Sequence, residues 1–390
     1  MNATPPLAAL KSLAVYVHWP YCARVCPYCD FNVVRDRGQP EQAALAEAIV
    51  ADLEAQARLI GSRTLVSVFF GGGTPSLMAP DWVARILETA RALWTPRGAV
   101  EVTLEANPTD AETGRFAAFA EAGVTRLSLG VQALNDKALA FLGRNHDAAE
   151  ARRAATLARR HFDQLSLDLI YALPGQTPAA WVAEIDAALA FEPDHLSPYQ
   201  LTIEPGTAFA RSATRGMLVP AEPDLAATLY EVTQAELNAR GFEAYEVSNH
   251  ARGLAARSRH NLAYWRGDDY VGAGPGAHGR LTLDGVRTAT RAAKGMRDYI
   301  AAVRRGGAGF AETEALSTRD AALERLLMGL RIHEGVAWTD LSALDLSMDS
   351  RRAKHLASHG LLSMNAGRLW ATQAGRAVLD RVIGELANAG

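Results

Sequence analysis

Short apolar runs alternate with longer segments of helical period from Leu13 to about Thr207. In one helical segment, for example, Trp181, Ile185 and Leu189 recur at every fourth position. Repeated strand–helix units predict a parallel sheet with right-handed crossovers. Six units favour an α/β fold with a partial (β/α)6 barrel of the TIM type, and a flat doubly wound sheet is the alternative. The predicted strands are Leu13–Trp19, Leu65–Phe70, Val100–Glu105, Arg126–Gln132, Leu165–Tyr171 and His195–Ile203.

Polar side chains share one face of the third, fourth and fifth predicted strands, where every second residue is apolar. If the apolar faces pack under helices, Glu105, Gln132 and Asp168 point inward near the C-terminal ends of their strands. Barrels of this type bind ligands at that end. The pattern therefore predicts a ligand site there, and solvated edge positions are the plainer alternative.

The strand–helix alternation stops after Thr207, which divides the chain into four predicted parts: a leader (1–12), the barrel (13–207), an accessory region (208–310) and a C-terminal domain (311–390). The accessory region contains a helix-like stretch, Pro223–Arg240, a glycine-rich turn, Val271–Gly279, and a hairpin, Arg280–Ala289. The sequence of the last part predicts helices, two short strands and a final helix. We expect a small winged-helix-like α+β domain, whose fold alone does not establish a function.

Composition and charge narrow the classes of function. The 390 residues are 49% hydrophobic and 21% charged, as in soluble globular proteins of two or three domains. A net charge of −3 does not favour nucleic acid as a partner. No run of about 18 apolar residues occurs, and the first twelve residues do not resemble a signal peptide. We expect a cytoplasmic protein with no integral membrane segment, and peripheral membrane contact stays open.

The three cysteines fall within eight residues, Cys22, Cys26 and Cys29, directly after the first predicted strand. A secreted disulfide framework would use an even number spread along the chain, so this grouping indicates metal. Thiolates hold iron–sulfur clusters, usually four for each cubane, and three would leave one iron open to an external ligand. The alternative is zinc with His18 as fourth ligand, although structural zinc sites usually pair ligands from two separated knuckles.

The motif C-x-x-x-C-x-x-C, with an aromatic residue before its last cysteine, resembles the radical S-adenosylmethionine superfamily. Further motifs resemble the oxygen-independent coproporphyrinogen III oxidase family within it, and together they span the chain from Leu13 onward. These motifs are Val15–Cys22, Cys26–Asn32, Phe69–Ser76, Glu105–Pro108, Ser128–Gln132, Leu142–His146, Asp168–Thr177 and His260–Trp265. The resemblance implies a [4Fe–4S] cluster on Cys22, Cys26 and Cys29, with S-adenosylmethionine on the remaining iron.

The resemblance also implies which residues hold S-adenosylmethionine. Gly72, Gly73 and Thr74 would receive its amino end, and the absence of side chains would expose backbone groups to it. Arg144 could pair with its carboxylate in a fork. The other implied contacts are Glu105, Gln132 and Asp168, with Tyr16 and Tyr28 beside the methionine and adenine parts.

One departure from the oxidases concerns function. In the oxidases a further cysteine follows two positions after the last cysteine of the motif. Phe31 stands at that position here, and the sequence has no fourth cysteine. Phe31-Asn32 and the HNxxYW string instead resemble the haem chaperone branch of the family (the HemW proteins). Haem iron takes an axial side chain, most often His, Cys, Met or Tyr. Because the cysteines are assigned to the cluster, His260 is the candidate ligand of the haem iron, with Tyr264 one helical turn later. His278 is the second candidate.

Three hypotheses follow. The first is a haem chaperone that binds haem and delivers it to acceptor proteins of unknown identity. The second is an active radical enzyme, a coproporphyrinogen III dehydrogenase, in which cleaved S-adenosylmethionine abstracts hydrogen from a tetrapyrrole. The third is a zinc-stabilised barrel with unrelated chemistry. The missing fourth cysteine favours the first hypothesis and leaves enzymatic activity uncertain.

Overall fold

The computed structural model describes residues 10–36, 38 and 41–387. Most of the predicted leader therefore lies outside the described residues, and the first strand begins at Ser12.

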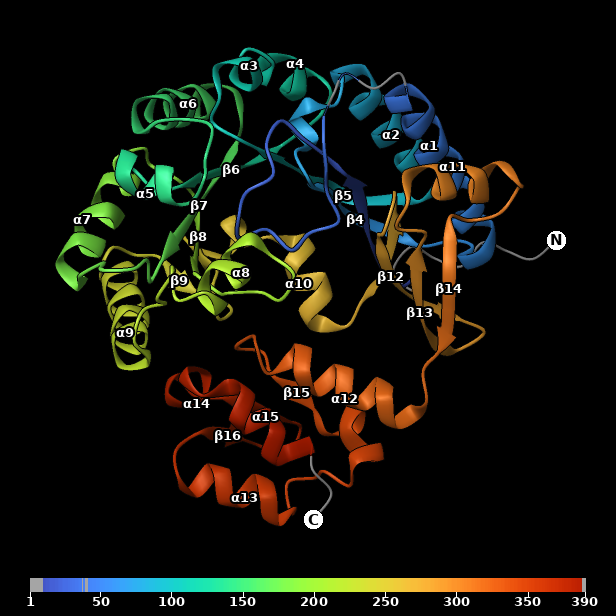
Figure 1. Cartoon of the computed structure of the whole chain (residues 1–390). Coiled ribbons are helices and arrows are strands. Elements are labelled where there is room, and N and C mark those ends of the chain that lie inside the picture. The colour runs from blue at the N-terminus through green and yellow to red at the C-terminus, as the bar shows by residue number, and fades with distance from the viewer. Residues whose placement is uncertain (1–9, 37, 39–40, 388–390) are drawn as a thin grey trace.

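A curved sheet forms the body of the protein (Figure 1), in the order β14-β13-β12-β11-β1-β4-β5-β6-β7-β8-β10-β9. Its central strands, from β11 to β8 in this order, are parallel to one another. The two ends of the order, β14 and β9, are not paired with each other, so the sheet does not close into a full barrel. This arrangement confirms the predicted partial barrel. The parallel strands are β1 (Ser12–Trp19), β4 (Thr64–Gly72), β5 (Thr95–Ala106), β6 (Arg126–Gln132), β7 (Gln164–Tyr171), β8 (His195–Gln200) and β11 (Asp269–Ala273).

The parallel strand β11 was not predicted. Its last residues fall in the stretch expected to be a glycine-rich turn, and β11 instead pairs with β1 in parallel, Val17 opposite Ala273. Gly272 explains why the strand is hard to recognise. A Cβ there would lie 2.1 Å from the carbonyl oxygen of His278, so only glycine lets the next strand come this close.

Helices cover the convex outer face of the sheet (Figure 1), and the apolar residues of the strands are buried beneath them. Val102, Leu129 and Leu167, from three successive strands, are at most 1% exposed. The packing accounts for the alternation in the sequence, because the opposite, polar faces of these strands are left for the interior. The outer helices are α1 (Glu41–Ile60), α2 (Pro80–Leu93), α3 (Asp110–Thr113), α4 (Phe116–Glu121), α6 (Ala148–His161), α7 (Pro178–Leu189) and α9 (Pro223–Ala239).

Both edges of the parallel region are extended by residues of the accessory region. Antiparallel β10 (His250–Ala251) and β9 (Glu243–Ala244) follow β8, while β12 (His278–Leu283), β13 (Val286–Ala292) and β14 (Phe310–Ala315) follow β11. The predicted hairpin is confirmed, with its turn at Asp284 and Gly285, which have φ angles of 48° and 83°. The remaining elements here are α5 (Asp136–Phe141), α8 (Ala208–Thr214), α10 (Arg259–Arg266), α11 (Met296–Arg304), β2 (Tyr21–Cys22), β3 (Val34–Arg35) and the 3-10 turns Pro75–Leu77 and Leu254–Ala256.

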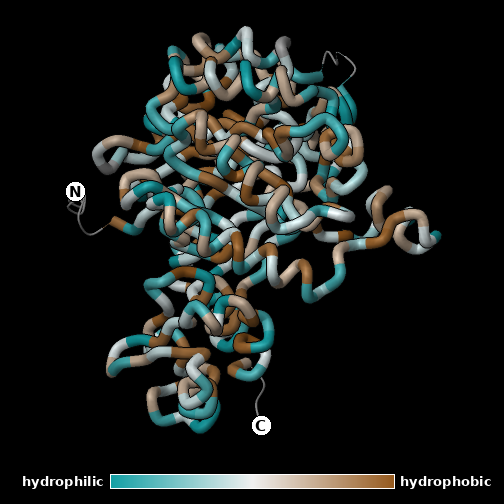
Figure 2. The backbone as a smooth tube through the Cα atoms, turned by 90° about the vertical axis from the view of Figure 1, so that its left-hand side faces the viewer, coloured by the Kyte–Doolittle hydropathy of each residue, from teal (hydrophilic) through white to brown (hydrophobic). Residues whose placement is uncertain are grey.

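The C-terminal part has its own core and forms a lobe below the barrel (Figure 2). Because β14 pairs with β13 up to Ala315, the barrel sheet extends past the predicted boundary at residue 310. The lobe has the predicted helices and strand pair. Its elements are α12 (Thr318–Gly329), β15 (Val336–Ala337), a 3-10 helix Trp338–Leu344, α13 (Arg351–Ser358), β16 (Leu362–Met364), β17 (Arg368–Ala371), α14 (Gln373–Ala377) and α15 (Leu379–Ala387). No helix in the described part of the chain is both long and apolar enough to cross a membrane.

Candidate functional site

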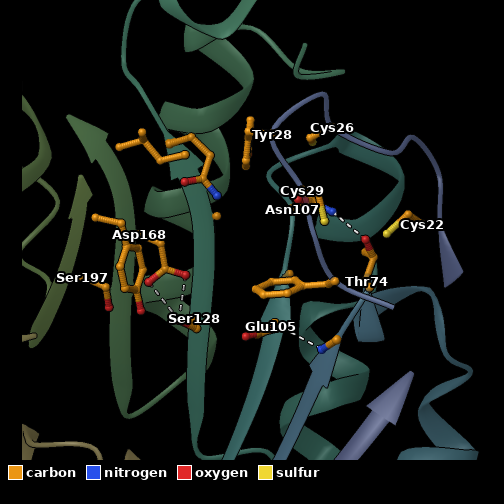
Figure 3. Close-up of a pocket in the computed structure, with 18 of the residues that line it drawn as sticks. Cys22, Cys26, Tyr28, Cys29, Thr74, Glu105, Asn107, Ser128, Asp168 and Ser197 are labelled. Carbon is orange, nitrogen blue, oxygen red and sulfur yellow. Dashed lines mark hydrogen bonds between the residues drawn. The ribbon is translucent and has the colours of Figure 1, made fainter. Parts of the chain in front are cut away.

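A cavity of about 690 Å³ opens at the C-terminal ends of the parallel strands, where barrels bind ligands. The cysteine loop forms one wall, and Asp168 and Ser197 lie on the opposite side (Figure 3). Glu105, Gln132 and Asp168 all line the cavity, as the strand alternation predicted. Gln132 reaches it through a bulge at the end of β6, where its φ is 64°.

Cys22 ends β2, and Cys26 and Cys29 lie on the loop between β2 and β3, at the mouth of the cavity. Cys22 is buried, Cys26 and Cys29 are half-buried, and none forms a disulfide. Burial raises the pKa of Cys22 to about 11. No three His, Cys, Asp or Glu side chains among the described residues are grouped to hold a single metal ion. A cubane takes each thiolate on a different iron, so it does not require the three sulfurs to meet at one ion.

Arg144 joins the cysteine loop to the barrel. Its Nη1 donates to Cys26 Sγ at 3.3 Å and to the Tyr28 hydroxyl at 3.4 Å. Its Nη2 donates to the Gly130 carbonyl at 3.0 Å and to the side-chain oxygen of Asn107. The charge of this guanidinium also acts on Cys22 and Cys29, where it works against the rise in pKa that burial causes.

Two side chains support the loop from below (Figure 3). Asn107 Nδ2 donates to Thr74 Oγ1 at 3.0 Å, and the Thr74 hydroxyl bonds the thiol of Cys22. Asn107 was not among the residues predicted to contact the ligand. A signal was present, because it lies two positions after the inward-facing Glu105 and therefore on the same side of the chain.

The cavity holds two carboxyl groups with raised pKa values. Burial, together with the charge of Asp168, raises the pKa of Glu105 to about 8. Burial likewise raises the pKa of Asp168 to about 6, although hydrogen bonds from Ser128, at 3.0 and 3.1 Å, and from Ser197 work against the rise. Neither carboxyl has an ion-pair partner among the described residues. A cationic ligand would therefore be attracted here.

The glycine loop after β4 lines the cavity, as expected of a loop that meets the ligand. The N–H groups of Gly72, Gly73 and Thr74 all donate within the protein, so a ligand's amino group would have to meet other atoms of this loop. Glycine is needed here because a Cβ on Gly72 would lie 2.5 Å from the His18 ring. The acceptors are Glu105 Oε2 at 3.2 Å, the Trp19 carbonyl at 2.8 Å and the Tyr21 carbonyl at 2.8 Å.

Tyr16 and His18 lie behind the cavity wall rather than on it. Tyr16 is not among the lining residues, and its hydroxyl is 3.1 Å from His18 Nδ1. His18 Nε2 is 2.9 Å from the carbonyl oxygen of Asn32. Because both ring nitrogens of His18 have partners inside the protein, the geometry gives no support to His18 as a zinc ligand.

His260 is also away from the cavity. It is 1% exposed, its Nδ1 is 3.1 Å from Ser67 Oγ, and its Nε2 is 2.7 Å from the hydroxyl of Tyr264. The ring stacks on Phe69 with centroids 4.8 Å apart, and burial lowers its pKa to about 3. Tyr264 does share its face, as expected. The structure nevertheless contradicts the expectation that His260 is open to haem iron, because both nitrogens are occupied in the core.

The HNxxYW string instead connects two parts of the protein. It forms α10, whose first turn is held by the buried carboxylate of Glu101, which accepts from the backbone N–H of His260 at 3.1 Å. At the other end, Arg325 donates to the Trp265 carbonyl at 3.0 Å, and Arg331 lies 4.6 Å above the Trp265 ring. The helix therefore links the barrel to the C-terminal lobe.

Comparisons with known proteins agree with this architecture. Residues 16–188 match the model of the radical SAM superfamily, and residues 316–378 match that of the HemN C-terminal domain. The chain is 41% identical to "Radical S-adenosyl methionine domain-containing protein 1, mitochondrial" of Bos taurus, over 97% of the chain and 88% of that protein. It is 36% identical to "Heme chaperone HemW" of Mycobacterium tuberculosis, over 97% of the chain and 96% of that protein. The solved structure of coproporphyrinogen III oxidase (HemN) from Escherichia coli has the same fold, with a TM-score of 0.79 at 22% identity, covering 97% of this chain and 91% of that one.

Proposed function

The chain belongs to the radical SAM superfamily and, within it, to the family of the HemW proteins, and from this premise we propose that it is a haem chaperone. It binds haem and passes it to acceptor proteins, and it carries a [4Fe–4S] cluster and S-adenosylmethionine as resident cofactors. The observation that carries the proposal is full-length similarity to relatives of that name, together with a three-cysteine loop at the mouth of a ligand-sized cavity.

Cys22, Cys26 and Cys29 would hold the cluster. Their thiols are unpaired and reach the cavity mouth, and the Arg144 guanidinium beside Cys26 offsets the negative charge that thiolates and cluster bring. When bound, the cluster supplies one-electron chemistry and an iron with an open coordination position. The chain's own part is to fix the loop, through Thr74 and Asn107, so that this open corner faces the cavity.

S-adenosylmethionine would occupy the cavity below the loop. Glu105 and Asp168 present carboxylates to its positive charge, and Gln132 and Tyr28 line the same space. Gly72, Gly73 and Thr74 border it, although their N–H groups are already engaged. Arg144 is also available to a carboxylate, because its Nε has no hydrogen-bond partner among the described residues. Tyr16 would act from behind, by holding His18 and the β1 end of the wall.

The position of Phe31 favours a chaperone over the oxidase. It stands where the oxidases have a further cysteine, and its side chain is 64% exposed at the cavity mouth. A tetrapyrrole is a large flat apolar ligand that such a side chain can contact. We expect a cytoplasmic protein, whose haem acceptors are proteins of unknown identity.

Two assays on anaerobically reconstituted full-length protein test the proposal. Haem titration followed by absorbance should give stoichiometric binding, and a haem-free acceptor added afterwards should gain the haem spectrum. Incubation with coproporphyrinogen III, dithionite and S-adenosylmethionine should give no protoporphyrinogen IX. Turnover of that substrate without stoichiometric haem binding would favour the radical enzyme instead.

A further inference from the structure

Haem iron needs an axial side chain, and the chain has ten histidines. Five of them are buried, and each has at least one ring nitrogen hydrogen-bonded inside the protein. Among these five, His195 lines the cavity, but both its ring nitrogens have partners, Ser166 Oγ at 2.8 Å and the Tyr245 hydroxyl at 2.9 Å. All five are less accessible to a bulky ligand than the exposed histidines. They are His18, His146, His195, His250 and His260. The exposed histidines are His161, His278, His333, His355 and His359.

Position separates His278 from the other exposed histidines. His161 ends the outer helix α6, and the remaining three, His333, His355 and His359, belong to the C-terminal lobe. His278 begins β12, directly after the turn 274–277 that follows β11. This turn packs against the end of β1, where a Cβ on Gly274 would lie 2.2 Å from the carbonyl oxygen of His18.

The same turn is bonded to the cysteine loop. Asn32 Nδ2 donates to the Pro275 carbonyl at 2.9 Å and to the Lys294 carbonyl at 3.1 Å. A Cβ on Gly276 would meet the Asn32 side chain at 2.6 Å, so the two segments are in contact. Phe31, the neighbour of Asn32, therefore lies on the same rim of the molecule as the start of β12.

The charges around His278 suit an anionic ligand. Arg280, Arg291 and Lys294 act electrostatically on the imidazole, and Arg291 lies directly opposite it on β13. Glu312 faces it and is paired with Arg291, and Arg280 is paired with Glu324. These pairs leave the charge of Lys294 as the net positive charge beside His278, and it complements haem, which carries two propionates on an apolar ring.

We propose that His278 is the axial ligand of the haem iron, at the rim where β12 begins beside the cysteine loop. The inference rests on the haem-binding function proposed above. One Fe–N bond forms between the iron and the exposed neutral imidazole as a water ligand leaves the iron, and no electron is transferred. Phe31 contacts the ring, and Lys294 and the arginines of β12 and β13 face the propionates. His260 keeps its structural place in the core.

The test compares His278→Ala with the control His161→Ala in full-length protein carrying its cluster. Haem titrations should show the wild-type Soret band for the control. The His278→Ala variant should have a shifted Soret band and at least about tenfold weaker binding, since removing even a second-shell partner of a metal ligand costs about 10- to 100-fold. Free imidazole should restore the wild-type band in His278→Ala, a rescue that a merely structural role would not give.

Two results would overturn the assignment in distinguishable ways. If the wild type and His278→Ala take up haem with the same affinity and the same Soret band, His278 is not the ligand while the chaperone function stands. If the wild type itself takes up no haem, the proposed function fails and the ligand assignment falls with it. Circular dichroism and cluster absorbance should match between the variants, because His278 is exposed and packs no core.

Discussion

Binding of S-adenosylmethionine should weaken sharply as the pH falls from 8 to 6. The pKa of Glu105 is raised to about 8, so at neutral pH much of this carboxyl holds a proton in the empty cavity. The sulfonium of S-adenosylmethionine is positive throughout this range and favours the ionised carboxylate. Affinity is therefore fully present above pH 8 and is lost as the pH falls below it.

The magnitude follows from the ionised fraction of Glu105. With a pKa of about 8, that fraction is about one half at pH 8 and about one hundredth at pH 6, so the apparent affinity should fall about 50-fold. Asp168, with its pKa raised to about 6, adds about a further factor of two at pH 6.

Anaerobic calorimetric titration at five pH values measures this dependence. Glu105→Gln keeps the side-chain volume, removes the titrating group and should flatten most of the slope, while binding more weakly than the wild type at pH 8. Ser128→Ala is a comparison variant, because it removes hydrogen bonds to Asp168, keeps the Glu105 carboxyl and acts on that carboxyl only through the charge of Asp168, so most of the slope should remain. Equal slopes in the wild type and Glu105→Gln, or a wild-type affinity that does not vary with pH, would show that the ionisation of Glu105 does not control binding.

Three further variants test the structure around the site. Cys22→Ala should lose the cluster absorbance but keep the far-UV spectrum and cooperative melting of the apoprotein; global unfolding would contradict a separate site loop. Gly72→Ala, at a φ of 109° and against the His18 ring, should cost about 1–3 kcal/mol of stability in urea melts, and an unchanged midpoint would argue against the close approach. His260→Ala leaves the hydroxyls of Ser67 and Tyr264 unpaired and should lower the stability of the fold by about 3 kcal/mol, seen as a lower melting temperature. Haem binding should be retained. Loss of haem binding in a folded variant would instead support His260 as the haem ligand.

The barrel was predictable from the sequence because the burial of each strand face is visible in the residue pattern of that strand alone. Alternation of apolar and polar residues marks which side of β5, β6 and β7 lies under helices, and Glu105 and Asp168 were placed correctly on that basis. The strand β11 was missed because it is short and contains Gly272, which is dictated by the closeness of β12 rather than by strand propensity.

The details of the site depended on contacts between distant segments. Nothing in a glycine run reveals that the N–H of Gly73 would bond to the Trp19 carbonyl, more than fifty residues earlier. In the same way, the burial of His260 depends on Ser67 and Phe69 of β4, nearly two hundred residues earlier in the chain. Motif resemblance identified the segments that meet at the cavity, but not which of their atoms remain free.

Cys22, Cys26 and Cys29 are proposed to hold a [4Fe–4S] cluster whose fourth iron takes S-adenosylmethionine. The decisive measurement is electron paramagnetic resonance of the reconstituted, dithionite-reduced protein, recorded with and without S-adenosylmethionine. We expect a cluster signal that changes when S-adenosylmethionine is added, because the open iron gains a ligand. A protein that shows no cluster signal, or a signal that S-adenosylmethionine leaves unchanged, would contradict it.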